Sequence, residues 1–108
     1  MSPDEIQANY EVLKSLAHPT RIAVVYALLE GEMTAGEIFQ LFETFDISTV
    51  SKHLSVLKNA RIISNRRAGS TVIYRLETPC VANCLRCVVN VVEEIKRNRD
   101  GRRAGKEA

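Results

Sequence analysis

The stretch that decides the fold is residues 34–60, TAGEIFQLFETFDISTVSKHLSVLKNA. Thr34 and Glu37 match a capping box, and the apolar residues after them predict a short helix that ends at residue 43 or 44. Asp46 is a good N-cap for a second helix. Two helices joined by so short a connection are typical of a helix-turn-helix. The core face predicted for the second helix is formed by Ile47, Val50, Leu54 and Leu57.

The outward face of this second helix is polar. It carries Ser48, Thr49, Ser51 and Lys52. Hydroxyls and a cation near the positive end of a helix can contact phosphates and base edges. We assign His53 to the same surface, with packing at the flank of the helix as the alternative. The face therefore predicts contact with nucleic acid.

Two short strands are predicted after this helix, over Ile62–Arg66 and Thr71–Leu76. Gly69, in the connection between them, can take the positive φ that a tight turn needs. Arg66 and Arg67 stand at the rim of this hairpin, where they can reach the DNA backbone or the minor groove. A short helix, a polar-faced helix and a basic hairpin, in this order, predict a winged helix-turn-helix whose second helix enters the major groove.

Further helices are predicted on both sides of this unit. A capping box at Ser2 begins one over Pro3–Leu16, and Pro19 begins another that ends before Gly31. The last helix begins at Pro79, and its apolar spacing is that of a helix seam that needs a partner helix, so we predict a homodimer. The fold class is mainly α with a small β-hairpin. The predicted apolar faces are Ile22, Val25, Tyr26 and Leu29 in the second of these helices, and Val81, Leu85, Val88, Val92 and Ile95 in the last.

The chain has the length of one domain, with 108 residues of which 45% are hydrophobic. We assign residues 1–97 to a DNA-binding and dimerisation domain. The apolar pattern stops at Ile95, so we expect the charged residues after it to be frayed or disordered, with residues 98–108 as a basic tail. An acidic start and the lack of a membrane-spanning apolar run predict a cytoplasmic protein with no membrane partner.

Charge is distributed unevenly along the chain. Residues 1–46 carry 2 Lys and Arg against 8 Asp and Glu, which sums to −6, and residues 47–108 carry 13 against 5, which sums to +8. A protein that presents one basic surface to a polyanion has this kind of asymmetry. The predicted partner is double-stranded DNA, although a winged helix that binds only another protein is an alternative.

Three stretches make a family resemblance specific. They are Leu16–Ile22 (LAHPTRI), Ser48–Leu54 (STVSKHL) and Arg66–Leu76 (RRAGSTVIYRL), and they resemble the ArsR/SmtB family of winged-helix repressors in order and spacing over roughly residues 10–77. The resemblance implies a homodimer paired through its first and last helices, which binds an inverted-repeat operator and leaves it when an inducer binds. It also implies that Ile47–Ala60 is the recognition helix. Ile47 departs from the pattern, because many members carry a polar residue there.

The inducer site differs from two that are common in this family. Thr34 and Gly36 stand where many metalloid sensors carry a Cys-x-Cys pair, and the last helix has no histidine for a zinc site. That helix instead offers three cysteines at i, i+4 and i+7, on one face near its beginning, where a helix start and a nearby arginine favour the thiolate. Three thiolates suit a trigonal thiophilic centre, so arsenite or antimonite is the leading inducer. The predicted ligands are Cys80, Cys84 and Cys87.

Helix geometry opposes a simple version of this site. Positions 80 and 87 are about 10.5 Å apart along an ideal helix axis, too far for both sulfurs to hold one ion. Either the first turn unwinds, or cysteines of two copies share the ion. A redox or persulfide switch is the main alternative, followed by sensing of a soft heavy metal or an iron–sulfur cluster and by cysteines that only fill space in a dimer core.

Enzymatic chemistry has no support in the sequence. There is no histidine beside the cysteines, no phosphate-binding glycine loop and no pair of catalytic carboxylates. We therefore predict a regulator that is not an enzyme and that needs no obligatory cofactor.

Overall fold

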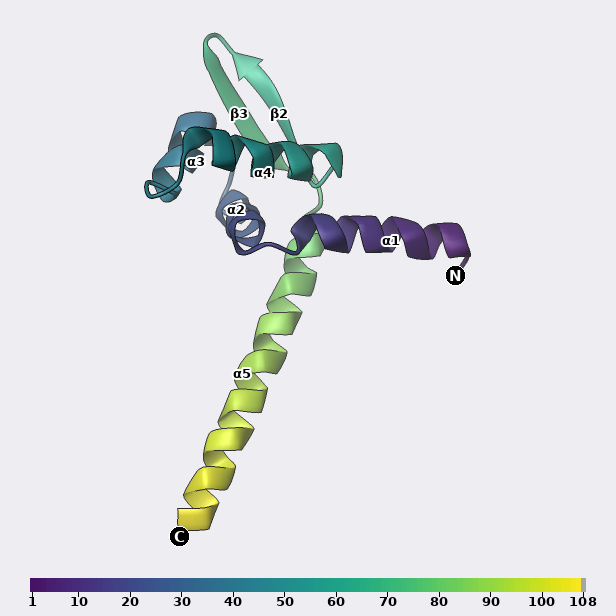
Figure 1. Ribbon diagram of the computed structural model, residues 1–108, viewed down its shortest axis with the longest axis vertical. Helices are drawn as coiled ribbons and strands as arrows, with labels where there is room; N and C mark the ends of the chain where they lie inside the picture. Colours follow the sequence, from purple (N-terminus) through teal and green to yellow (C-terminus); the bar gives the residue numbers. More distant parts are fainter. Residues whose placement is uncertain (108) are drawn as a thin grey trace.

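The computed structural model describes residues 1–107, and for Ala82 and residues 101–107 it describes the backbone alone. It is mainly helical with a small antiparallel sheet, as the sequence predicted (Figure 1). Ala108, the end of the predicted tail, lies outside the described residues. The elements are α1 (Pro3–Leu16), α2 (Pro19–Leu29), β1 (Met33–Thr34), α3 (Ala35–Leu41), α4 (Ile47–Asn59), β2 (Ile63–Ala68), β3 (Thr71–Leu76) and α5 (Pro79–Glu107).

Local sequence signals explain where the first and third helices begin. The backbone N–H of Glu5 donates to the Ser2 hydroxyl and the Glu5 carboxylate accepts from the Ser2 N–H, both at 3.2 Å. Thr34 and Glu37 form the same reciprocal pair at the start of α3, at 3.1 and 3.0 Å. Both capping boxes predicted from the sequence are confirmed, and each satisfies two backbone donors that a helix start leaves free.

The hairpin is longer and tighter than predicted. Strand β2 runs to Ala68, so the connection to β3 is only Gly69 and Ser70. Gly69 has a φ of +67°, and glycine is favoured at the first of two such loop residues because it has no Cβ to clash. Strand β1, which was not predicted from the sequence, has two residues and pairs with β3 through Met33 opposite Tyr74. The sheet order is β1-β3-β2.

The core lies where α2 meets α4 and the sheet. Helix α2 contacts α1, α4, α5 and β3, and it buries Val24, Val25 and Leu28. Of the face predicted for this helix, only Val25 is fully buried, while Ile22, Tyr26 and Leu29 are half-buried. A helix with neighbours on several sides has no single buried stripe, which explains the error. The buried apolar residues are Leu16, Val24, Val25, Leu28, Ile38, Val50, Leu54, Leu57, Ile62 and Ile63.

Helix α4 confirms three of its four predicted core residues. Val50, Leu54 and Leu57 are 0–2% exposed. Ile47 is 63% exposed, so its assignment to the core was wrong. It is the first residue of the helix, and the core does not reach beneath that end of α4.

Helix α5 is longer than expected, because it continues to Glu107 instead of ending near Ile95. No proline interrupts it, and two glycines in the last turns cost only about 1 kcal/mol each relative to alanine. It starts beneath the body, where Val81 and Leu85 pack against the core, and then extends away from it (Figure 1). The division of the chain into a domain over residues 1–97 and a separate tail over residues 98–108 stays a prediction.

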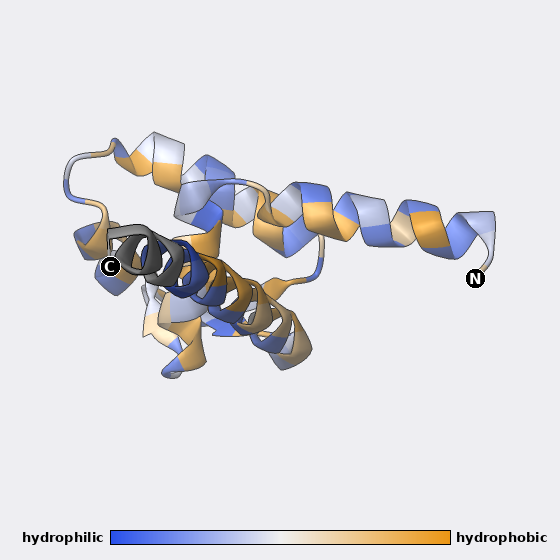
Figure 2. Ribbon diagram, turned by 90° about the horizontal axis from the view of Figure 1, so that it is seen from below, coloured by the Kyte–Doolittle hydropathy of each residue, from blue (hydrophilic) through white to orange (hydrophobic). Residues whose placement is uncertain are grey.

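Helices α1 and α5 each carry exposed apolar residues in the described part of the chain. On α1, Ile6, Tyr10 and Leu13 are 52–61% exposed, and on α5 the residues Val88, Val89, Val91, Val92 and Ile95 are 44–55% exposed. Figure 2 shows bands of apolar residues along both of these helices. Within the described residues, no single helix is long and apolar enough to cross a membrane, and α1 and α2 meet that condition only as a pair bent by 91°.

Candidate nucleic-acid interface

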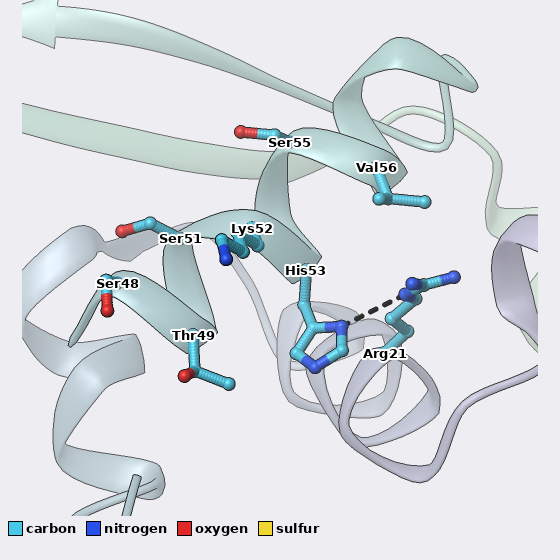
Figure 3. Close-up of a pocket in the computed structure, with 8 residues that line it drawn as sticks. All are labelled: Arg21, Ser48, Thr49, Ser51, Lys52, His53, Ser55 and Val56. Carbon is cyan, nitrogen blue, oxygen red and sulfur yellow. Dashed lines mark hydrogen bonds between the residues drawn. The ribbon is translucent and has the colours of Figure 1, made fainter. Parts of the chain in front are cut away.

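The outward side of α4 forms an open groove with α2. All five residues of α4 that the sequence analysis assigned to nucleic-acid contact line it (Figure 3). Ser48, Thr49 and Lys52 are exposed, and Ser51 and His53 are half-buried. The full lining is Arg21, Ser48, Thr49, Ser51, Lys52, His53, Ser55 and Val56. Hydroxyls and cations are thus gathered on one continuous surface, with a chemistry that suits phosphates and base edges.

The beginning of α4 differs from the other helix starts in the body. Asp46 is the N-cap, but its side chain makes no capping hydrogen bond. In α1, α2 and α3 a side chain does accept from the first turn, and in α2 it is Nδ1 of His18, which accepts from the N–H of Thr20 at 3.1 Å. First-turn N–H groups of α4 that have no side-chain cap can donate to a phosphate oxygen from outside the protein.

His53 joins α4 to α2. The Nε of Arg21 donates to Nδ1 of His53 at 3.1 Å, and Nη1 of Arg21 donates to the Ser15 carbonyl at 3.2 Å. The His53 ring lies 4.2 Å from that of His18, centroid to centroid. Burial, helped by the charges of His18 and Arg21, lowers the pKa of His53 below its usual value. These contacts favour the packing interpretation of His53 and a neutral ring, so a phosphate contact as a cation has less support.

The wing is the hairpin of β2 and β3, and its two predicted arginines differ in their contacts. Both terminal nitrogens of Arg66 bond the carboxylate of Glu32 at 2.8 Å, which lowers the pKa of Glu32 and raises that of Arg66. Arg66 is therefore held against the turn before β1. Arg67, the next residue along β2, is exposed, and among the described residues the only other ion pair joins Arg75 to Glu77. Arg67 is the free cation of the wing within that part of the chain.

Sequence reasoning missed two partners in this region. Arg21 lies inside the stretch that carried the family resemblance, so that stretch was the signal for it. Glu32 had no signal, because it meets Arg66 across 34 positions of sequence through folding alone. Both are side chains that orient an assigned residue.

The three cysteines lie along the exposed side of α5. All are exposed free thiols. Among the described residues, no group of three His, Cys, Asp or Glu side chains is close enough to hold a metal ion. Cys84, Val88 and Val91 follow one another at i, i+4 and i+7, so the thiols share a stripe with the unpartnered apolar residues. One chain does not bring the three predicted ligands together, and the same stripe offers them to a second chain.

Comparison with known proteins adds to this geometry. Residues 18–65 match the family described as bacterial regulatory proteins of the arsR family. The chain is 32% identical over 89 residues to the uncharacterized HTH-type transcriptional regulator Rv0081 of Mycobacterium tuberculosis, which spans 82% of this chain and 78% of that protein. It is 35% identical over 85 residues to the transcriptional repressor SdpR of Bacillus subtilis, which spans 77% of this chain and 91% of SdpR.

Solved structures agree with the fold. The crystal structure of Rv0081 superposes with a TM-score of 0.77 at 29% identity and covers 92% of this chain and 98% of that one. The solution structure of a homodimeric winged helix-turn-helix domain, Mb0332 from Mycobacterium bovis, gives a TM-score of 0.72 at 26% identity and covers 87% of this chain and 89% of that one. The winged helix-turn-helix predicted from the sequence is confirmed.

Proposed function

Since this chain belongs to the ArsR family of bacterial regulatory proteins, we propose that it is a homodimeric, cytoplasmic repressor that binds an inverted-repeat operator and leaves it when thiols of α5 capture an inducer. The relatives are transcriptional regulators, so the activity that we propose for this chain is DNA binding without catalysis. The proposal rests chiefly on one observation, the gathering of Ser48, Thr49, Ser51 and Lys52 along one outward surface of α4.

In this proposal the first turns of α4 enter the major groove, and the wing lies beside it. Hydroxyls and Lys52 contact phosphates and base edges, and Arg67 contacts the backbone. Two copies related by a twofold axis place their α4 helices in successive major grooves, which is the reason for an inverted repeat. The predicted DNA-binding residues remain Ser48, Thr49, Ser51, Lys52, His53, Arg66 and Arg67. Of these, His53 and Arg66 contribute by holding α4 and the hairpin in place through their bonds to Arg21 and Glu32.

The DNA-binding part is tested by fluorescence anisotropy on the promoter of its own gene. Lys52→Gln should weaken binding about tenfold, because each copy loses one charge contact. Lys58→Gln is the matched control, since Lys58 is exposed in the last turn of the same helix and outside the groove. Equal effects of the two variants, or binding that does not weaken with added salt, would contradict the proposed interface.

Dimerisation is supported by the apolar residues that α1 and α5 leave exposed, because a domain this small gains stability by burying them against a second copy. Val92→Glu should increase the dissociation constant of the dimer at least tenfold, since each copy would bury an unpaired carboxylate. Asn90→Glu adds the same group to the other side of the helix and should leave the dimer intact. Sedimentation equilibrium measures both. A wild-type chain that is monomeric at micromolar concentration would exclude this arrangement.

The proposed inducer is arsenite or antimonite. Three thiols replace the three hydroxyls of arsenous acid and release three water molecules, which yields a neutral As(SR)₃ centre. The spacing along α5 and the shared stripe with Val88 and Val91 support a site completed by Cys80, Cys84 and Cys87 of two copies. The ligand then stabilises the dimer arrangement that fits DNA poorly, with a coupling of roughly 1–3 kcal/mol.

A thiol redox switch is the second candidate, favoured by the exposure of all three thiols. A persulfide donor would transfer its outer sulfur to one thiol, and a second thiol would attack the inner sulfur of this protein persulfide to form a disulfide and release hydrogen sulfide. Two protein persulfides would instead join as a trisulfide, with loss of the same molecule. The reduced protein on its DNA is titrated with arsenite, antimonite, cadmium and a persulfide donor in turn. Release by arsenite or antimonite that is lost in Cys84→Ser supports the metalloid proposal. Release by the persulfide alone, reversed by dithiothreitol, supports the redox switch.

A further inference from the structure

Ile47 is an exposed apolar residue at the start of α4. It is 63% exposed; the two hydroxyl residues that follow it, Ser48 and Thr49, are exposed, and Phe45 before the helix is 49% exposed. The core-facing residues of the same helix are at most 2% exposed, so Ile47 contributes nothing to the packing of α4 on the body. A partner that buries this isoleucine would gain the free energy of removing its apolar surface from water.

A second copy of the chain does not account for this residue. The exposed apolar residues that repeat along a helix, as a helix-to-helix dimer contact needs, lie on α1 and α5, whereas Leu41, Phe45 and Ile47 are separate from them. Helix α1 meets α4 near Val56, Asn59 and Ala60, which belong to the last turns of α4. Helix α4 begins at its other end, beside α3 and away from α1 and α5 (Figure 1). Ile47 directly precedes Ser48 and Thr49, which line the groove that we assign to DNA.

We propose that Ile47 is a specificity-determining residue that contacts the C5-methyl group of a thymine in the operator. This inference rests on the proposed function, because it requires α4 in the major groove. The first residues of a recognition helix contact base edges there, and the thymine methyl is the one apolar group that the bases present. An isoleucine at this place favours an A·T pair with the methyl toward the protein, while Ser48 and Thr49 supply hydrogen bonds.

The test removes the methyl group and changes nothing else in the DNA. The reduced protein first selects its preferred duplex from a random pool. The thymines of that duplex are then replaced by deoxyuridine one at a time, and the affinity for each duplex is measured. We expect one thymine in each half-site at which the replacement weakens binding about fourfold, the effect of one buried methyl group. In Ile47→Ala the same replacement should have no effect.

Two controls separate the possible failures. Lys52→Gln should weaken binding to both duplexes and keep the full effect of deoxyuridine. Leu41→Ala, which truncates another exposed apolar residue at the end of α3, should keep it too. If no thymine is sensitive to replacement by deoxyuridine, or if Ile47→Ala keeps that sensitivity, the inference about Ile47 is wrong. The proposed function still holds in that case, provided that the protein binds the selected duplex in a salt-dependent way. If the protein selects no duplex at all, the proposed function itself fails.

Discussion

The polar surface of α4 is complete in one chain, whereas the thiol stripe of α5, formed by Cys80, Cys84 and Cys87, is not a complete ligand site in one chain. Around α4, a single copy brings together five residues predicted for DNA contact and fixes one of them with a bond from Arg21. Along α5, the three cysteines are exposed and no group of three ligand side chains forms in the described residues. The DNA surface is therefore part of the folded body, whereas the proposed sensor site needs either a second copy or a change of α5.

The largest effect should come from the core beneath α4. Leu54→Ala removes a side chain that is 2% exposed, so we expect the free energy of unfolding to fall by about 2–5 kcal/mol, as for other large-to-small core changes. Cys84→Ala should change it by far less, about 1 kcal/mol at most, because the thiol lies outside the core of the chain and the change removes a single sulfur atom. Urea unfolding of both variants measures the difference. A comparable loss in Cys84→Ala would mean that the thiol stripe is also part of the core.

The same difference explains how far the sequence could predict this protein. Helix starts depend on residues three positions apart, so both capping boxes were visible, and helical spacing identified Val50, Leu54 and Leu57. The ion pair of Glu32 with Arg66 and the pairing of β1 with β3 depend on tertiary contacts that no local pattern encodes. Spacing also cannot show that the core ends short of Ile47. For the cysteines, spacing gave a shared face and left open what completes the site.

A smaller effect should separate the two arginines of the wing and so show which cations of the DNA surface are free. Arg67→Gln should reduce the slope of log K against log salt by about 2 for a dimer, one phosphate contact per copy, with roughly tenfold weaker binding. Arg66→Gln should leave that slope nearly unchanged, because its guanidinium already bonds Glu32. Anisotropy between 50 and 200 mM salt, a range over which such slopes are large, measures both. A reduced slope in Arg66→Gln alone would reverse the two assignments.

A pH effect on stability should arise in the α4 region. The pKa of His53 is lower in the folded protein than its ordinary value of 6.5. Below pH 6.5 the unfolded chain therefore binds a proton that the folded chain resists, so this residue contributes stability above that pH and loses it as the pH falls. Thermal unfolding from pH 8 to pH 5 should show a smaller loss in His53→Gln than in the wild type. A loss of stability in His53→Gln as large as that of the wild type would contradict this assignment.

The smallest effect concerns the end of α4. Arg61 follows the helix with a φ of +62°, its N–H donates to the Lys58 carbonyl at 2.9 Å, and the N–H of Ile62 donates to the Leu57 carbonyl at 3.0 Å. This is the Schellman pattern, in which glycine is usual because a Cβ is unfavourable at positive φ. Arg61→Gly should therefore raise the free energy of unfolding by about 0.5–1 kcal/mol, measured by urea unfolding. Arg61→Ala removes the same charge and keeps the Cβ, so it should give no such gain. If both variants stabilise the protein equally, relief of charge repulsion is the cause and the backbone at this helix end is unstrained.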